Sequence, residues 1–213
     1  MISLPFAFAA SLLLGMRHAT DPDHVVAVTT IVSRERSVGR SIGVGVLWGV
    51  GHTVTIFAVG GAIILYKFAF TPRLGLSMEF SVALMLVVLG VLNLTARNGA
   101  PMQAPRLRPF LVGVVHGLAG SAAATLLILP LIDDAAWALL YLVVFGAGTV
   151  AGMALVTLAI AAPSVYAGAR LVGLQRGVRL ASGAVSLAFG AYLGYKIGFV
   201  DGLFTAQPHW TPQ

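Results

Sequence analysis

The stretch RHATDPDHV, residues 17–25, places two histidines, two aspartates and an arginine inside an apolar part of the chain. Residues 2–16 before it and residues 26–32 after it contain few polar side chains and no charged one. If these flanks lie in a membrane, each charged side chain at the bilayer centre costs about 2.5–3.5 kcal/mol unless it is paired. Ionisable groups at that depth indicate a functional site. Imidazole together with carboxylate narrows that site to a divalent metal ion or a proton path.

The composition indicates an all-α integral membrane protein. Of the 213 residues, 58% are hydrophobic and 9% are charged, whereas about a quarter of the residues in a soluble domain are charged. Long apolar runs favour helices over a β-barrel. Because the chain contains no cysteine, disulfides and thiolate metal ligands are excluded. We therefore expect one transmembrane domain over residues 1–213, with a short tail at 201–213, in the cytoplasmic (inner) membrane.

Apolar segments predict about six transmembrane helices, since each crossing takes ~20 apolar residues. The first segment is too long for one straight crossing. Pro22 predicts a break into two half-helices meeting near residues 19–22, because proline lacks an N–H and disfavours a helical residue before it. The predicted spans are about 3–33, 41–66, 79–96, 110–131, 136–162 and 179–199.

Basic residues gather after the first, third and fifth spans, in short loops, which is the positive-inside pattern. This pattern accounts for the net charge of +6, so we do not expect nucleic-acid binding. It predicts cytoplasmic odd-numbered loops and both termini outside. In the fourth loop we expect Asp133 and Asp134 to form a solvated turn. Nine of the thirteen Lys and Arg follow the pattern: Arg34, Arg36, Arg40, Arg97, Arg106, Arg108, Arg170, Arg176 and Arg179.

The chain also repeats itself at a nearly constant offset. Three pairs of glycine-containing segments are separated by 98, 97 and 100 residues: Gly15 with Gly113, Gly49 with Gly146, and Gly90 with Gly190. Each half contains three predicted spans, so the two halves must have opposite orientations. We expect inverted repeats at about 1–97 and 108–200, which is typical of secondary transporters with a site near the midplane.

The candidate ligands follow from the break in the first span. On a straight helix, His18 and His24 would lie about 240° apart round the axis, so the break is needed to turn both toward one ion. Asp23 is a candidate ligand, whereas Asp21 is either a ligand or only the N-cap of the second half-helix. Arg17 is expected to pair with Asp21 or Asp23, or to extend away from the cation.

Later spans supply further candidates. His52 follows Gly49 and Gly51 in GVGHTV, with Thr53 beside it, and is either a ligand or an interhelical hydrogen-bonder. His116 occupies the place of His18 in the second repeat but has no neighbouring carboxylate in the sequence. Only hydroxyl side chains such as Ser121 lie near it. His209 stands in a polar tail, and we expect it to be solvated.

RHATDPDH resembles the signature RHAxDADH of the nickel/cobalt transporter (NiCoT) family, with Pro22 where that family usually has alanine. GVGHTV at residues 49–54 is similar to the family's second motif, and FGAGTVAGM at residues 145–153 is similar to a late glycine-rich motif. The resemblance covers most of the chain and implies permeation of Ni(II) or Co(II). The metal residues that it implies are His18, Asp23, His24 and His52.

The chain departs from that family in two respects. It has fewer expected spans, and HGLAGSAAAT at residues 116–125 lacks the acidic residues of the family's third motif. In both it resembles the shorter urease-accessory-type nickel permeases. The superfamily also includes exporters. The long His-rich loop that some exporters carry is absent here, which favours uptake over efflux.

Two other classes of protein compete with a transporter. A membrane metalloenzyme would hold zinc with an open position for water, but no HExxH motif is present. A bis-histidine haem or quinone protein is the second alternative. We expect no enzyme activity and no permanently bound cofactor, with the metal ion as substrate and the lipid bilayer as surroundings. A homo-oligomer and a separate energising or metallochaperone partner stay open.

The charge pattern makes a topology prediction. A reporter active only in the cytoplasm, fused at Gln213, should give no signal, whereas the same reporter in the third loop should give a strong one. A strong signal at Gln213 with none in the third loop would overturn both the topology and the inverted-repeat interpretation.

Overall fold

The computed structural model describes residues 4–66, 71–96, 107–128, 132, 134–170 and 172–210, without the side chains of 4–5, 120–128, 167–170, 172 and 174. Within these residues the regular structure is wholly helical. In order, the helices are α1 (Leu4–His18), α2 (Pro22–Val32), α3 (Val38–Tyr66), α4 (Pro72–Leu94), α5 (Leu107–Ile128), α6 (Ala135–Arg170), α7 (Val172–Tyr195) and the short π-helix η1 (Lys196–Val200).

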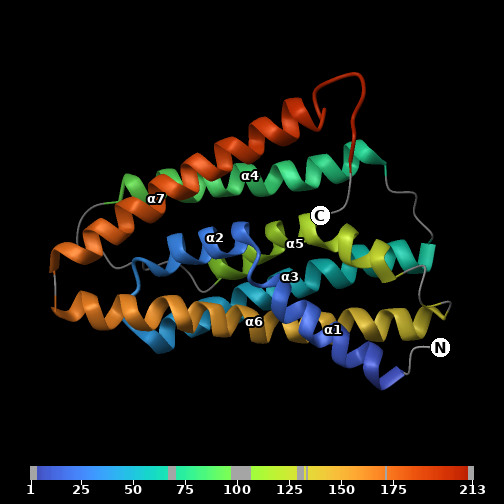
Figure 1. The fold of residues 1–213 in the computed structure, drawn as a ribbon, viewed down its shortest axis with the longest axis horizontal. Helices are drawn as coiled ribbons and strands as arrows, with labels where there is room; N and C mark the ends of the chain where they lie inside the picture. Colours follow the sequence, from blue (N-terminus) through green and yellow to red (C-terminus); the bar gives the residue numbers. More distant parts are fainter. Residues whose placement is uncertain are drawn as a thin grey trace.

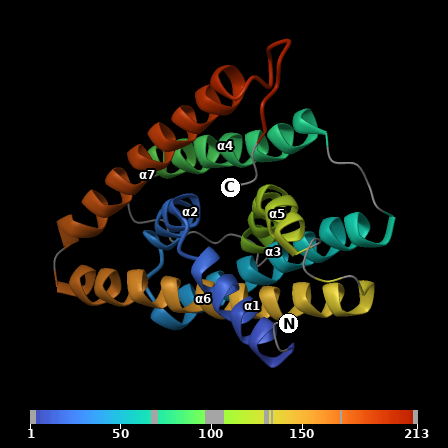
Figure 2. The same cartoon turned by 45° about the vertical axis from the view of Figure 1, so that its right-hand side comes forward.

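The helices pack in three layers (Figures 1 and 2). Helices α4 and α7 form one layer, and α3 and α6 form the opposite layer with α1 lying against α6. Helices α2 and α5 lie between these two layers, and Figure 2 shows both of them nearly end-on. The short helix after the break, α2, and helix α5 are therefore the central elements of the bundle.

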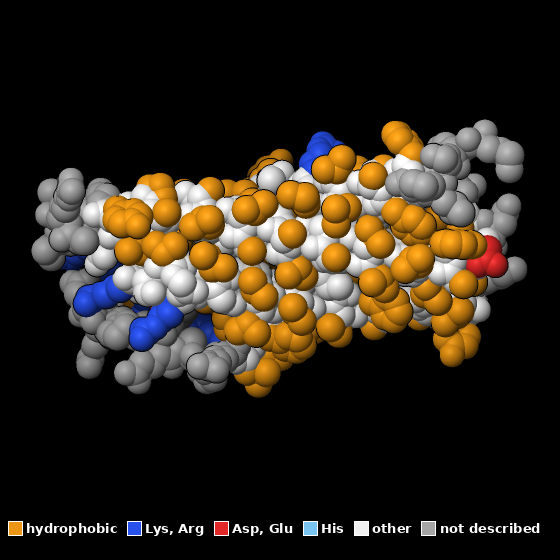
Figure 3. Space-filling model, turned by 90° about the horizontal axis from the view of Figure 1, so that it is seen from below, with side chains coloured by type: hydrophobic (Ala, Val, Ile, Leu, Met, Phe, Trp, Pro, Cys, Tyr) orange, Lys and Arg blue, Asp and Glu red, His pale blue; other side chains and the backbone are white. Residues whose placement is uncertain are grey.

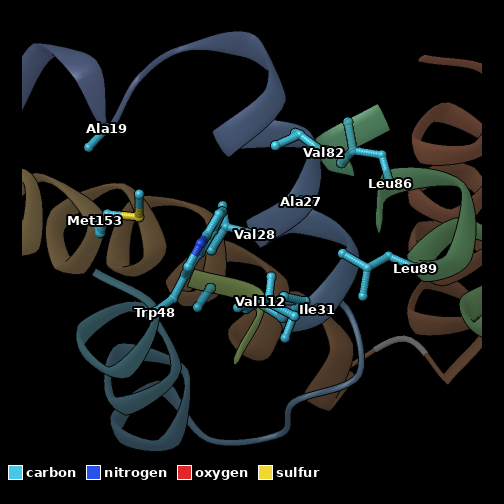
Figure 4. Close-up of a cluster of buried hydrophobic side chains, with 12 residues drawn as sticks. Ala19, Ala27, Val28, Ile31, Trp48, Val82, Leu86, Leu89, Val112 and Met153 are labelled. Atoms are coloured by element: carbon cyan, nitrogen blue, oxygen red, sulfur yellow. The ribbon is translucent and has the colours of Figure 1, made fainter. Parts of the chain in front are cut away.

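The apolar core surrounds α2. Its side chains Ala27, Val28 and Ile31 are buried, and Figure 4 shows Trp48 of α3 beside Val28. The remaining walls of this core come from α4, α5 and α6, through Val82, Leu86, Leu89, Val112 and Met153. A helix with apolar contacts on so many sides holds its first turn, the end of the polar motif, in one defined place.

Four helices are long and apolar enough to cross a membrane: Val38–Tyr66, Pro72–Leu94, Ala135–Tyr166 and Gln175–Val200. Pro22–Val32 and Leu107–Ala119 are shorter apolar helices. Figure 3 shows hydrophobic side chains along most of one face of the molecule. The chain is thus a helical membrane protein. Four of the six predicted spans meet these criteria within the described residues, and the count of six stays a prediction.

Some predicted boundaries were wrong. Helix α4 begins at Pro72 rather than 79, because the hydroxyl of Thr71 caps it by accepting from the Leu74 N–H at 3.3 Å, and proline suits the first helical position. Helix α6 continues to Arg170, past the predicted end at 162, with Pro163 inside it. The predicted helix starts were placed where the apolar runs begin. They therefore left out a more polar first turn, which in α4 is stabilised by the cap at Thr71.

In the acidic loop before α6, Asp134 has a further role besides being solvated. Asp134 is exposed, and its Oδ1 accepts from the backbone N–H groups of Ala136 and Trp137 at 2.9 and 3.1 Å. This carboxylate therefore caps α6, where it also complements the positive end of the helix dipole. Asp133 lies outside the described residues.

Charge is distributed unevenly between the two ends of the bundle. In Figure 3, Lys and Arg gather at the end where α3 and α7 begin, and acidic side chains lie at the other. Burial, together with the nearby Arg179 and Arg108, lowers the pKa of Arg34, which places arginines from three segments in one region. The N and C markers in Figure 1 lie toward the opposite end, where α4 and α6 begin. Which end faces the cytoplasm stays a prediction.

Glycines at matching positions of the two halves make reciprocal close contacts. A Cβ on Gly90 of α4 would lie 2.6 Å from the backbone N of Leu187, and a Cβ on Gly190 of α7 would lie 2.8 Å from the backbone N of Val87. Likewise, a Cβ on Gly51 would collide with the carbonyl of Phe110, and one on Gly148 with that of Leu12. Only glycine lets these backbones approach so closely.

Alanine at Gly90 should therefore destabilise the α4–α7 contact, because its Cβ would meet backbone that cannot rotate away. We expect a loss of about 1–3 kcal/mol, measured as a lower Tm in detergent. Gly43→Ala is the matched control, since a Cβ there meets nothing within 4 Å and alanine favours helix. Equal Tm values for the two variants would contradict the close-packing interpretation.

Candidate metal site

The polar motif lies at a break between α1 and α2. Helix α1 ends at His18 and α2 begins at Pro22. Asp21 between them has extended backbone angles, φ −60° and ψ 146°. The Thr20 hydroxyl closes the turn by donating to the Arg17 carbonyl at 2.6 Å. The predicted break is confirmed. It brings the rings of His18 and His24 to 4.7 Å between centroids, although a straight helix would separate them.

Asp21 orients His18. It stands at the N-cap position of α2 but makes no side-chain cap hydrogen bond. Its Oδ2 lies 2.7 Å from His18 Nδ1. Because an ionised carboxylate only accepts, Nδ1 donates to it, and in the neutral tautomer that this contact selects, the lone pair is on Nε2. A carboxylate that fixes the tautomer in this way is typical of metal-binding histidines.

His18 Nε2 in turn faces His52 of α3, with 3.1 Å between the two Nε2 atoms. His52 is fully buried. The rings of His24 and His52 lie edge to face with centroids 5.1 Å apart. Three imidazoles from three helices therefore converge, and each offers a nitrogen within 4.8 Å of the others.

Asp23 joins the two halves of the chain. Its Oδ1 lies 3.1 Å from His24 Nδ1 and accepts from the His24 backbone N–H at 2.9 Å. Its Oδ2 lies 2.9 Å from Nε2 of His116 on α5. Asp23, His24 and His116 form a second set of groups able to hold an ion, with His24 common to both sets. His116, which has no acid near it in the sequence, receives its carboxylate from α2.

The buried imidazoles have nitrogens without partners. His24 is 2% exposed and His116 1%. Within the described residues, His24 Nε2, His52 Nδ1 and His116 Nδ1 have no hydrogen-bond partner. A buried polar atom left without a partner costs about 1–3 kcal/mol. Buried imidazoles with unpartnered nitrogens, grouped with a carboxylate in sets able to hold an ion, fit a divalent transition metal.

The indole of Trp48 forms an apolar wall to the site. It stacks on His24 with ring centroids 5.7 Å apart and an interplanar angle of 19°, and its centroid lies 5.4 Å from that of His116. By excluding water on this side, the indole strengthens the electrostatic interactions inside the site.

Other predicted site residues lie elsewhere. Of the two alternatives predicted for Arg17, the structure agrees with extension away from the site. Arg17 is exposed, and within the described residues Asp21 and Asp23 contact histidines instead. The Thr53 hydroxyl donates to the Gly146 carbonyl at 3.1 Å, so it joins α3 to α6 rather than facing the cluster. The side chain of Ser121 lies outside the described residues.

A cavity of about 310 Å³ adjoins the cluster. Its polar lining includes His18, Asp21, Asp23, His24 and His116, and its apolar lining includes Val82 and Phe189. Glu79 of α4 also lines it, a residue that the sequence analysis did not single out. The available signal was that Glu79 is the one acidic residue in the range 72–94.

The fold and the site together define a multi-helix membrane protein with a buried imidazole–carboxylate cluster. Among curated proteins, the urease accessory protein UreH of Bacillus sp. (strain TB-90) is 36% identical over 210 residues, covering 90% of this chain and 92% of that protein. The chain therefore belongs to the UreH family of urease accessory proteins. No family model and no solved structure matches it. The resemblance to urease-accessory-type proteins is thus confirmed, while the identity of the metal and the direction of its transport stay predictions.

Substitutions at the cluster should separate ligands from scaffold. His18→Ala, His24→Ala and Asp23→Asn should each weaken Ni(II) binding by purified protein at least about tenfold, the loss typical of altered metal-site partners. Asp23→Asn keeps the shape and removes one charge, so it tests charge balance directly. His116→Ala should have an intermediate effect.

His209→Ala is the control for these variants, because His209 is exposed and lies in the tail. Isothermal titration in detergent, at matched Tm, measures each affinity. Wild-type affinity in the His18 and His24 variants would rule out the metal-site interpretation.

Proposed function

We propose that this chain is a secondary transporter that carries divalent transition-metal ions, Ni(II) and/or Co(II), across the cytoplasmic membrane in the direction of uptake. The observation that carries the proposal is the buried cluster of His18, Asp23, His24 and His52 inside a helical membrane protein. Unpartnered imidazole nitrogens at membrane depth are costly, and a transition-metal cation would satisfy them. The ion is the substrate, not a resident cofactor.

The donor set supports this class of ion. Imidazole suits nickel, cobalt, zinc and iron, whereas copper(I) favours the soft sulfur ligands that the cluster lacks. One carboxylate, Asp23, offsets part of the charge of a divalent cation. The resemblance of residues 17–24 to the nickel/cobalt transporter signature selects nickel and cobalt from this group.

The shared ligand supports a transfer between two positions. His24 belongs both to the set with His18 and His52 and to the set with Asp23 and His116. An ion that moves between the sets exchanges two ligands while His24 is retained. The cation then keeps at least one protein ligand at every position between the two sets. This lowers the free-energy barrier to its movement, because a cation without donors in an apolar medium is costly.

We further propose an inverted-repeat architecture, with repeats at about 1–97 and 108–200, because helices at corresponding positions make corresponding contacts. In this arrangement α1, α3 and α4 of the first repeat correspond to α5, α6 and α7 of the second. Helix α1 packs on α6 as its counterpart α5 packs on α3, and α3 packs on its own counterpart α6, as α4 does on α7. The glycine contacts described above follow the same correspondence, since Gly51 of α3 meets α5 and Gly148 of α6 meets α1. If α1 with α2 makes the first crossing and α5 the fourth, the cluster lies between the repeats, where transporters bind their substrates.

The location of the cavity supports uptake over efflux. Its lining includes Glu79 near the start of α4 and Ile197 in η1, and these segments lie in the half of the bundle that contains the termini (Figure 1). With both termini outside, the cavity approaches the cluster from the external side. A homo-oligomer and a separate energising or metallochaperone partner are both compatible with this arrangement.

Reconstitution of the purified chain into liposomes tests the proposal. We expect Ni(II) accumulation above that of empty vesicles, with Co(II) competing more effectively than Zn(II) or Fe(II). His18→Ala and His24→Ala vesicles, at matched protein content, should behave as empty ones. The metal inside is measured by mass spectrometry after removal of external ions.

The rival interpretation, a membrane metalloenzyme, predicts a different outcome. Such a protein would bind the metal without moving it, because zinc enzymes keep the ion fixed and open one position to water. Ni(II) binding at the cluster without accumulation in vesicles would therefore favour the rival.

A further inference from the structure

Glu79 has no role in the cluster described above, yet it lines the same cavity as Asp21, Asp23, His24 and His116. Its side chain is only partly exposed. One oxygen, Oε1, accepts a hydrogen bond from the Trp210 indole Nε1 at 2.8 Å. Within the described residues, no cationic side chain pairs with it, because the nearby Lys196 binds Asp201 at 3.3 Å. The carboxylate therefore lines the cavity without an ion-pair partner of its own among the described residues.

The C-terminal segment is built so that Trp210 reaches Glu79. The indole lies against Gly75, one helical turn before Glu79, where a Cβ would come within 2.5 Å of the ring. A turn at Gly202, with φ +86°, reverses the chain. The backbone N–H of His209 donates to the carbonyl of Asp201 at 2.8 Å and closes the loop. These contacts hold one carboxylate oxygen and leave the other, Oε2, without a hydrogen-bond partner within the described residues.

We propose that Glu79 is an external metal-binding residue, which takes a hydrated divalent cation in the cavity before the ion reaches the imidazole cluster. This inference rests on the proposed function and adds the residue that captures the substrate. The observation that points to a ligand, besides the carboxylate, is the pair of unpartnered buried atoms His24 Nε2 and His116 Nδ1 on residues of the same cavity wall.

The chemistry divides between the two ends of this path. Glu79 and Asp21 supply oxygen donors, which suit a cation that still keeps most of its waters. The cavity of about 310 Å³ has room for such an ion. The imidazoles beyond it suit the dehydrated transition metal. Glu79 should therefore raise the local concentration of divalent cations without choosing among them, and selection falls to the histidines.

The alternative is that Glu79 only anchors the tail through Trp210. Three substitutions separate charge from anchoring. Glu79→Gln keeps a carbonyl acceptor for the indole and removes the charge. Trp210→Phe keeps the ring beside Gly75 and removes the N–H. Glu79→Asp keeps the charge on a shorter arm that withdraws it from Trp210. Glu35→Gln is the control, since Glu35 lies between α2 and α3, away from the cavity lining.

The measurement is the initial rate of Ni(II) uptake against concentration, in vesicles at matched protein content. For Glu79→Gln we expect KM to rise at least about tenfold with kcat changed less than about twofold, because loss of capture weakens binding of the ion without altering its later movement. Glu79→Asp and Trp210→Phe should raise KM less than about threefold, and Glu35→Gln should match wild type.

Two results would overturn the inference. One is a wild-type KM for Glu79→Gln, and the other is a Trp210→Phe or Glu79→Asp effect as large as that of Glu79→Gln. If Glu79→Gln fails to insert, the KM values of Glu79→Asp and Trp210→Phe still decide. Both variants weaken the contact between residue 79 and the indole, so only the anchoring role predicts that both raise KM strongly and equally. Failure of the proposed function is a separate outcome, in which wild-type vesicles take up no metal at all.

Discussion

Asp23 binds two imidazoles from opposite halves of the chain with its two carboxylate oxygens, His24 of α2 and His116 of α5. This bridge requires the break at Pro22, because the break turns the start of α2 into the bundle rather than along α1. It also requires α2 and α5 both to lie between the outer layers (Figure 2). The two central helices are therefore joined by one electrostatic contact, a carboxylate shared between buried histidines.

The glycine contacts make this arrangement sterically feasible. Gly51 lies one residue before His52, and its close approach to Phe110 brings α3 against α5. Gly117, next to His116, in turn meets the backbone of His52. A side chain at either glycine would separate the helices that carry the two histidines. The packing glycines and the site histidines are neighbours in the sequence because the same close contact serves both.

The site has one apolar and one polar side. Trp48 and the core around α2 exclude water from one side, while the cavity with Asp21 and Glu79 approaches from the other. In the proposed function, the carboxylates of the open side would attract a cation and the nitrogens next to the closed side would hold it. The tail at 201–210 contacts a residue of this cavity, because Trp210 donates to Glu79, although the tail follows the last helix.

The sequence by itself determined the membrane class and the break at Pro22, and it singled out His18, His24 and His52 as candidate ligands. These depend on composition, on the covalent geometry of proline and on local motifs. Only the tertiary structure decided that His116 contacts Asp23 across 93 residues, that Trp210 contacts Glu79 across 131, and that Arg17 pairs with neither nearby aspartate. Helical periodicity reports which residues share a face, but partners on other helices depend on how the helices pack, which no local pattern encodes.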